Sequence, residues 1–332
     1  MKKSLIIALG AIALVACTKT SVSYEQTGEI GFAPVVRKNS TKAAVEGTAF
    51  PEQNIKVFGY YDNSMPVGSS YASGTFAVEY LPGVEFAKKG ATWAGATTPY
   101  YWPKTGSMLF AGYSPVDFAG VTFTLASNKF SVAECPQPEF SATKDLLYAG
   151  YTTSVLGGTA PMTFSHALSW VTVKAKAADA NQIKITNIKF VGLAEKGSST
   201  GLPEWTVSGT KEQLNVFAPT SAFAVPAAET LVESNPNCGL VFPQNLTDAA
   251  EIVVSYEMNN GAGQWFAQAP FVQKLNLLTS GVNKIDKWEA GKHYTYIINF
   301  SAIGEPGSKN EIKINPSITD WTPVTAAGIS AN

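Results

Sequence analysis

Apolar and polar residues alternate over short stretches along most of this chain, and clusters of Gly, Pro, Asn and Ser separate the stretches. The most regular stretch places Tyr294, Tyr296, Ile298 and Phe300 on one face. A period of two residues is that of a strand with one buried face, and many short strands between turn formers are typical of antiparallel sandwiches. The best helical candidate is the short stretch Ser165–Trp170. The pattern therefore predicts an all-β chain with at most a few helical turns.

A chain of 332 residues suits two domains of ordinary size, each with its own core. In Trp170–Lys176 the alternation puts Val171, Val173 and Ala175 in a core and turns the other side chains outward. The turn formers that follow, Ala177–Gln182, have no apolar period, and we place the domain boundary there. The two expected domains are residues 38–178 and 179–332.

The first apolar run of the second domain changes phase in its middle. Ile183 and Ile185 share a parity that Ile188 and Phe190 do not. An extra residue in one strand of a pair produces such a shift, so we expect a β-bulge at residues 186–187.

The segment Gly28–Lys38 carries the alternation of a half-buried strand. Because proline has no N–H to donate, we expect its proline to confine this strand to a sheet edge. The residues expected to face the core are Ile30, Phe32, Pro34 and Val36.

Arg37, at the end of this strand, is the only arginine among 24 basic residues. The polar stretch Lys38–Thr48 has no apolar period and reads as an exposed loop, and exposed loops are preferred sites of proteolysis. A cut between Arg37 and Lys38 would separate residues 18–37, a tether and a removable first strand, from the rest of the chain.

The N-terminus has the features of a targeting segment. Lys2 and Lys3 precede an apolar run, Leu5–Val15, that is too short to span a bilayer. The run ends in Leu-Val-Ala-Cys at Leu14–Cys17, which resembles the bacterial lipoprotein signal. Residues 1–17 are therefore expected to be a signal peptide together with the lipidated Cys17.

Composition excludes one class of partner. Hydrophobic residues make up 45% of the chain and charged residues 15%, which indicates an ordered globular protein. The net charge is -1 and the lysines are scattered singly, whereas a nucleic-acid binder needs a basic stripe to neutralise phosphates. We expect no nucleic-acid partner.

The residues that could carry catalysis do not form a recognisable site. Ser165 and His166 would point to opposite faces of a strand, and His293 is far away in the sequence. Two histidines and two distant cysteines make no metal-ligand cluster, and Gly261–Gly263 suits a hairpin turn better than a dinucleotide loop. We expect no enzyme activity, no cofactor and no metal.

Two pairs of residues leave alternatives open. Cys135 and Cys238 could form a disulfide, although two small buried thiols are the favoured reading. Asp320 lies beside Trp321, and a glycan site could use the aromatic rings of Trp93, Trp102 or Trp321, although β-spaced aromatics are more often core residues.

Taken in order, several segments together resemble the fimbrillin family of Bacteroides-type bacteria. They cover nearly the whole chain, and their order is more specific than any one of them. They are the lipobox at Cys17, Arg37 after a short strand, Tyr101–Pro103, Ser107–Pro115, Lys144–Ala149, Phe164–Lys174, Leu240–Gln244, Trp288–Tyr296 and Ile312–Trp321.

This resemblance implies two transthyretin-like β-sandwich domains in tandem and a role as a fimbrial subunit in adhesion. It also implies an outer-membrane lipoprotein precursor that carries lipid on Cys17, and an arginine-specific surface protease that cuts between Arg37 and Lys38. A strand from another subunit, of its own kind or a sister, would then fill the slot. The short tail Thr322–Asn332 leaves open a stalk, accessory, tip or anchor position. The ligand on a host or bacterial surface also stays open.

A different class of function shares the same fold and lipid. In it the chain is a permanently anchored surface protein that binds a glycan or a host surface and is never cut. The two readings differ in what they require of Arg37, because a permanent binder has no use for an arginine behind its first strand.

The strand that refills the slot has two candidates. Glu311–Ile318 repeats the pattern of Glu29–Val36, with Glu first, apolar residues at the second, fourth and eighth places, and Pro sixth. Such a segment could fit the same slot, or it could be the last strand of the second domain, with the donor in the tail Thr322–Asn332. The matching core-facing residues are Ile312, Ile314, Pro316 and Ile318.

Overall fold

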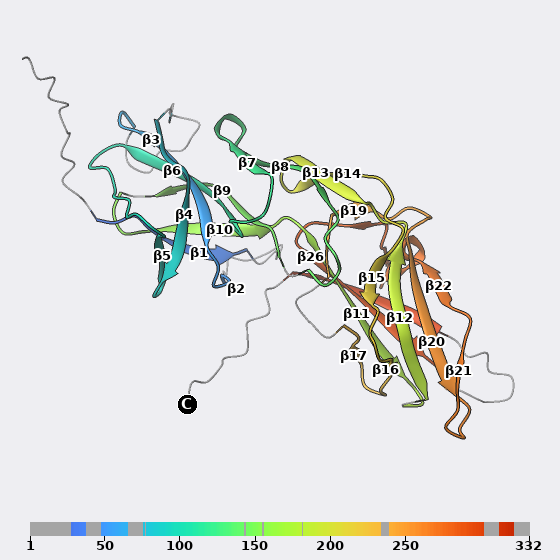
Figure 1. Cartoon of the computed structure of the whole chain (residues 1–332). Helices are drawn as coiled ribbons and strands as arrows, with labels where there is room; N and C mark the ends of the chain where they lie inside the picture. The colour runs from blue at the N-terminus through green and yellow to red at the C-terminus, as the bar shows by residue number, and fades with distance from the viewer. Residues whose placement is uncertain are drawn as a thin grey trace, which may run out of the picture.

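The strands follow the alternation of the sequence. The computed structural model describes residues 28–37, 48–65, 76, 78–142, 144–154, 156–180, 182–233, 239–301 and 312–321. Within them the chain consists of β-strands and connecting turns, with two single-turn 3-10 helices, η2 (Leu125–Ser127) and η3 (Leu275–Leu277). The predicted all-β fold is confirmed, and most strands of the first half lie on one side of the molecule and most strands of the second half on the other (Figure 1).

The first sheet closes on itself. Its order is β10-β9-β6-β3-β4-β5-β1-β2, and β1 also pairs with β10, so the strands from β10 to β1 form a ring around a buried apolar cluster. The strands are β1 (Gly31–Val36), β2 (Thr48–Ala49), β3 (Ile55–Asp62), β4 (Val78–Lys89), β5 (Thr92–Gly95), β6 (Ser107–Ser114), β9 (Leu147–Ser154) and β10 (Thr159–His166).

Two sheets of the second half pack face to face over one core. One contains β11 (Ser169–Ala177), β17 (Thr230–Leu231), β18 (Leu240–Val241), β26 (Lys292–Phe300) and β27 (Ile312–Asp320). The other contains β12 (Ile183–Val191), β15 (Leu214–Phe217), β16 (Phe223–Ala224), β20 (Glu251–Asn259), β21 (Trp265–Ala267) and β22 (Phe271–Lys274). The predicted core face of β26 is confirmed, because Tyr294, Tyr296, Ile298 and Phe300 are all at most 2% exposed.

A further sheet joins the two halves. Its order is β14-β13-β8-β7, with β7 (Val121–Thr124) and β8 (Lys129–Pro136) from the first half and β13 (Lys196–Gly201) and β14 (Glu204–Ser208) from the second. We call it the shared sheet. The described residues also contain two small pairs, β19 (Gln244–Asn245) with β25 (Lys287–Trp288), and β23 (Thr279–Ser280) with β24 (Asn283–Lys284).

An apolar cluster from both halves lies at this junction. Phe130 and Val132 of β8 pack in it together with Trp170 and Phe242 from the second half, and Tyr113 of β6 belongs to it as well. All eight residues of β6 are buried, because one face of this strand fills the ring and the other faces the junction. The sequence did not predict this connection between the halves.

The change from the first sheet to the second lies earlier than the predicted boundary. β10 ends at His166 and β11 begins at Ser169, and β11 pairs with β26 over its length. The turn formers at residues 177–182 instead connect β11 to β12 within the second half. The transthyretin-like character of the two halves stays a prediction.

Three local expectations have clear outcomes. The bulge in β12 is confirmed, because its register against β20 shifts between Ile185 and Asn187. Ser165–Trp170, the best helical candidate, is not helical: it contains the end of β10, the two connecting residues Ala167 and Leu168, and the start of β11. The Gly261–Gly263 hairpin is confirmed, with the Asn259 and Asn260 side chains accepting N–H groups of the turn between β20 and β21.

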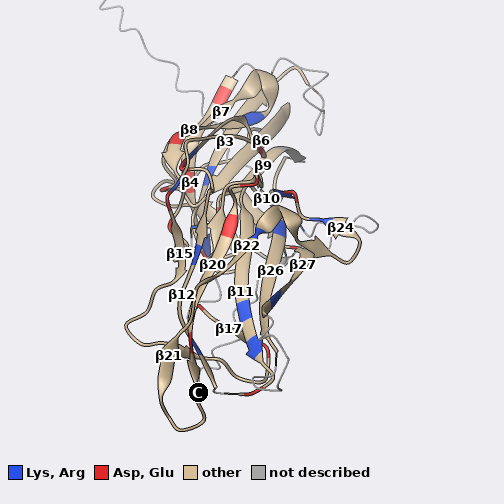
Figure 2. Ribbon diagram, turned by 90° about the vertical axis from the view of Figure 1, so that its right-hand side faces the viewer, with Lys and Arg blue, Asp and Glu red and all other residues tan. Residues whose placement is uncertain are grey.

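The outer face of β11 is only partly exposed. Val171, Val173 and Ala175 lie in the core as predicted, but Trp170 and Thr172 on the other face are also buried. That part of the prediction was wrong, because the start of β11 lies in the junction. Figure 2 shows β11, β26 and β27 side by side, with lysines as blue bands along β11.

The junction should stabilise both halves together. Phe130 is 1% exposed, and Phe130→Ala should lower the free energy of unfolding by about 3–5 kcal/mol, the usual range for a buried Phe. Urea unfolding measures this loss, and amide exchange should rise in strands of both halves. Phe266→Ala, at a side chain 51% exposed, is the control and should cost at most about 0.5 kcal/mol. A change in exchange confined to the first half would contradict the coupling.

Candidate functional site: the first strand and its slot

β1 is an internal strand of the first sheet. It pairs in parallel with β10 from Gly31 to Val36, and on its other side it meets β5 at Phe32 and β2 at Val35 and Val36. The residues just before β1 are held too, because the Ile30 N–H donates to Tyr100 O at 2.7 Å. Removing this strand would therefore open the ring along two sides.

The predicted core face of β1 is confirmed. Ile30, Phe32 and Val36 are each 0% exposed and Pro34 is buried as well, whereas Ala33 between them is exposed. The ring of Phe32 meets Phe86 and Phe110 edge to face, at centroid distances of 4.8 and 5.0 Å. Edge-to-face pairs add to the stabilisation from burial alone. We call the volume that these four side chains fill the β1 slot.

The prediction that Pro34 confines β1 to a sheet edge was wrong. Backbone N–H groups alternate between the two sides of a strand. The Arg37 N–H points to β10, where it donates to Phe164 O at 2.7 Å, so the missing N–H of Pro34 faces the other side. There Pro34 falls between the β5 contact and the β2 pairing, and its only register partner is Met162 of β10. Proline is tolerated because this position has no acceptor strand.

Arg37 ends the described part of the first segment, and its side chain is exposed. Burial raises the pKa of Tyr148 on β9 to about 12, and the positive charge of Arg37 acts in the opposite direction, which places Arg37 near the start of β9. Lys38, the following polar loop and Cys17 lie outside the described residues. Cleavage after Arg37 and lipidation of Cys17 stay predictions.

The candidate donor residues belong to a different sheet from the slot. They lie on β27, which pairs with β26 in antiparallel fashion from Ile312 to Asp320 and stands at the end of the strand order. Ile314 is buried in the core of the second half, and Ile312 and Ile318 pack partly against it, while Pro316 is partly buried. β27 is thus the last strand of the second half of this same chain. The tail 322–332 lies outside the described residues.

The two histidines serve packing at the junction. His166 Nδ1 lies 2.5 Å from Asp145 Oδ2, and the His166 ring stacks on Trp321 at 3.8 Å between centroids. His293 stacks on Trp170 at 3.6 Å, and Trp170 in turn packs against Trp321 at 5.6 Å. Sequence reasoning missed this row of four rings, because nothing local shows that residues so far apart meet.

The described residues neither pair Ser165 with His166 nor bring metal-ligand side chains together. Ser165 and His166 lie next to each other on β10, and the buried His166 ring is held between Asp145 and Trp321. The described residues contain no group of three or more His, Cys, Asp or Glu placed to hold a metal, and they form no helix able to cross a bilayer. Cys135 is a free thiol that donates to Gly197 O, and Cys238 lies outside the described residues.

The three tryptophans that a glycan site could have used are buried, in agreement with the favoured reading that they are core residues. Trp93, Trp102 and Trp321 are 5%, 1% and 7% exposed, so none presents a ring face to a sugar. Asp320 is paired with Lys292 at 2.6 Å. Packing accounts for all three tryptophans.

These features define an all-β protein in which a short first strand closes an apolar ring. Comparison with protein families then identifies it: the fimbrillin-like family matches residues 41–321, and the chain belongs to this family. No curated protein matches the chain.

Solved structures share the fold. A fimbrial protein of Bacteroides vulgatus has a TM-score of 0.60 at 13% identity, with 88% of this chain and 99% of that one covered. A protein of Bacteroides ovatus, named for a proposed role in cell adhesion, has a TM-score of 0.56 at 17% identity, with 90% and 99% covered.

His293 should titrate well below an ordinary histidine. Burial, with help from the charge of Lys174, lowers the pKa of His293 to about 4. The unfolded chain would bind a proton first as pH falls, so the contribution of this group to stability is full above about pH 6.5 and is lost by about pH 4. NMR titration of the imidazole signals measures the pKa, and His293→Phe, which keeps a ring on Trp170, identifies the signal. An apparent pKa near 6.5 would contradict the buried environment.

Proposed function

We propose that the chain is a subunit of a cell-surface fimbria that serves adhesion. In this proposal it is exported to the outer membrane as a lipoprotein through Cys17, is cut between Arg37 and Lys38, and assembles when a strand of another subunit replaces β1. Membership of the fimbrillin-like family and the fimbrial and adhesion names of similar structures support the role.

The observation that carries the proposal is the position of β1. β1 and Ile30 directly before it supply four buried side chains, and the only arginine of the chain follows the strand directly in an exposed position. A single cut there would separate a complete structural element from the body of the protein. The exposed edges of β10 and β5 and the empty slot would then form a template for strand addition.

The cut alone would not empty the slot. Burial of four side chains of this size contributes on the order of 6–12 kcal/mol before ordering costs are subtracted. The severed β1 would therefore stay in place until another strand displaces it. This property suits assembly, because the slot never has to stand open in water.

The tail 322–332 is the better donor candidate in this proposal. Donation of β27 would remove Ile314 from the core of the second half and break its pairing with β26 along the whole strand. Donation of the tail would leave all described contacts in place. Against the alternative of a permanently anchored glycan binder stands the burial of the three tryptophans that such a site would have used.

Cleavage at the single arginine can be tested directly. An arginine-specific protease should produce one new N-terminus at Lys38, because Arg37 is the only arginine in the chain and its side chain is exposed. N-terminal sequencing and intact mass measure the product. Arg37→Lys is the matched control: it keeps the charge and should resist this protease while trypsin still cuts it.

The same variants test the cellular role. Cells that carry Arg37→Lys should keep the protein in the membrane fraction and display no fibres of it, as judged by fractionation and electron microscopy. Normal fibres from Arg37→Lys cells would refute maturation at this bond.

Cysteine cross-linking can identify the donor. Thr163 is the register partner of Val35, so Thr163→Cys places a thiol beside the β1 slot. After the cut, we expect a disulfide between subunits with Val324→Cys in the tail but not with Ser317→Cys on β27, the position that matches Val35 in the repeated pattern. Bonds from position 317 alone would make β27 the donor, and bonds from neither position would exclude assembly through this C-terminus.

A further inference from the structure

The edge of β11 that faces away from β26 is covered by a strap rather than by a full strand. We define the strap as residues 226–233 and 239–241. β17 pairs with β11 only at Lys174 and Ala175, and β18 pairs only at Ser169 and Trp170. The middle of β11 lies between these two short pairings.

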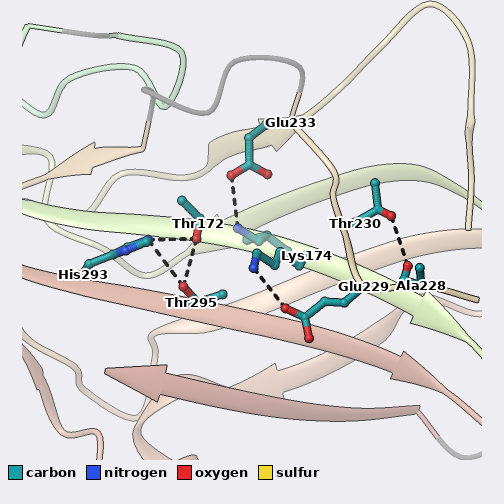
Figure 3. A network of polar contacts seen from close by, with 9 residues as sticks. Thr172, Lys174, Ala228, Glu229, Thr230, Glu233, His293 and Thr295 are labelled. Atoms are coloured by element: carbon teal, nitrogen blue, oxygen red, sulfur yellow. Dashed lines mark hydrogen bonds and ion pairs between the residues drawn. The ribbon is translucent and has the colours of Figure 1, made fainter. Parts of the chain in front are cut away.

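One of the hydrogen bonds between β11 and the strap is accepted by a side chain. The Ala177 N–H donates to Pro226 O at 2.9 Å and the Val171 N–H to Gly239 O at 2.8 Å. The N–H of Val173, between them, donates instead to Glu233 Oε1 at 3.2 Å (Figure 3). A carboxylate oxygen thus takes the place of a backbone carbonyl.

The strap backbone is held close to β11 by its glycine. Gly239 has φ +94°, and a Cβ there would lie 1.9 Å from Val171 O. No other residue fits, because both the conformation and the space exclude a side chain. Val232, next to Glu233, is 3% exposed and belongs to the core of the second half. The strap is therefore pressed against β11 on both sides of the side-chain hydrogen bond.

Glu233 is buried without a full set of partners. It is 6% exposed, and its Oε2 has no hydrogen-bond partner among the described residues. The charged neighbour that acts on it is Lys174 of β11, which is already paired with Glu229 of the strap at 3.0 Å. His293 of β26 bonds to Thr172 instead (Figure 3). Burial, partly offset by hydrogen bonds and Lys174, raises the pKa of Glu233 to about 7.

We propose that Glu233 makes the strap a pH-sensitive latch on β11, closed while the carboxyl group is protonated and loosened when it ionises. The protonated acid accepts from Val173 through Oε1 and carries its proton on Oε2. The ionised group leaves Oε2 charged, buried and unpaired, which favours opening of the strap to water. This inference does not depend on the proposed fimbrial role.

The difference in proton binding between the open and closed strap decides whether a rise in pH opens or closes it. In the open strap Glu233 has an ordinary pKa of 4.5, whereas in the closed strap its pKa is about 7. The closed state therefore binds the proton more tightly, and its advantage is full below pH 4.5 and lost as pH rises to about 7. The opening equilibrium should increase on the order of 30-fold between pH 5 and pH 7 and then level off.

Hydrogen exchange at the Val173 amide measures this opening. After correction for the intrinsic exchange rate, protection of Val173 should fall from pH 5 to pH 7 by the stated factor. Glu233→Gln keeps an acceptor oxygen but cannot ionise, so its protection should stay flat over the same range. Glu229→Gln removes the neighbouring exposed carboxylate and should keep the pH dependence of the unmodified protein.

Two results would overturn the latch. One is corrected protection of Val173 that does not change with pH in the unmodified protein, and the other is a pH dependence that persists in Glu233→Gln. Should Glu233→Gln not fold, the carboxyl carbon shift of Glu233 in the unmodified protein decides. Titration near pH 7 supports the latch, and titration near pH 4.5 refutes it.

Discussion

Burial of the even-numbered side chains of β1 is the interaction on which the first half of the molecule depends. The ring is closed only because β1 pairs with β10 on one side and with β5 and β2 on the other. Without it the sheet would have two unpaired edges and an apolar slot, which proteins avoid exposing. Since β1 precedes the only arginine of the chain, the element that completes the core is also the one that a single cut would separate.

β6 contacts both the slot and the junction, because its two faces pack in different apolar clusters. Phe110 packs on Phe32 inside the ring, whereas its neighbour Ala111 points to the other face and packs under the shared sheet together with Tyr113. Adjacent residues of a strand always face opposite sides. Because protein interiors are close-packed, a replacement strand with a different side chain at the position of Phe32 would shift β6. Such a shift would change the packing of Ala111 and Tyr113 at the junction, where strands of both halves meet.

The sequence predicted correctly which face of a strand is buried, but it did not predict which strands pair with each other across the two halves. The buried positions of β1 and β26 and the bulge in β12 follow from a period of two residues, which needs only the local chain. The shared sheet could not be predicted, because it depends on the pairing of β8 with β13. The alternation within each of these segments carries no information about which strand it pairs with. The stacking of His166 on Trp321 was hidden for the same reason. Arg37 could be singled out only because it is unique in composition.

Two positions show how the same constraint on backbone pairing is met in opposite ways. At Pro34 the chain lacks a donor, and the sheet leaves a gap between β5 and β2 so that no acceptor is left unpaired. At Val173 the chain has a donor but no opposing strand, and the Glu233 side chain supplies the acceptor. The first solution is insensitive to pH, because nothing in it ionises. The second is not, because a carboxylate buried at 6% exposure changes its charge within the range of its raised pKa, about 7. In the proposed latch, closure of the edge at β11 therefore depends on pH, whereas the pairing of β1 around Pro34 does not.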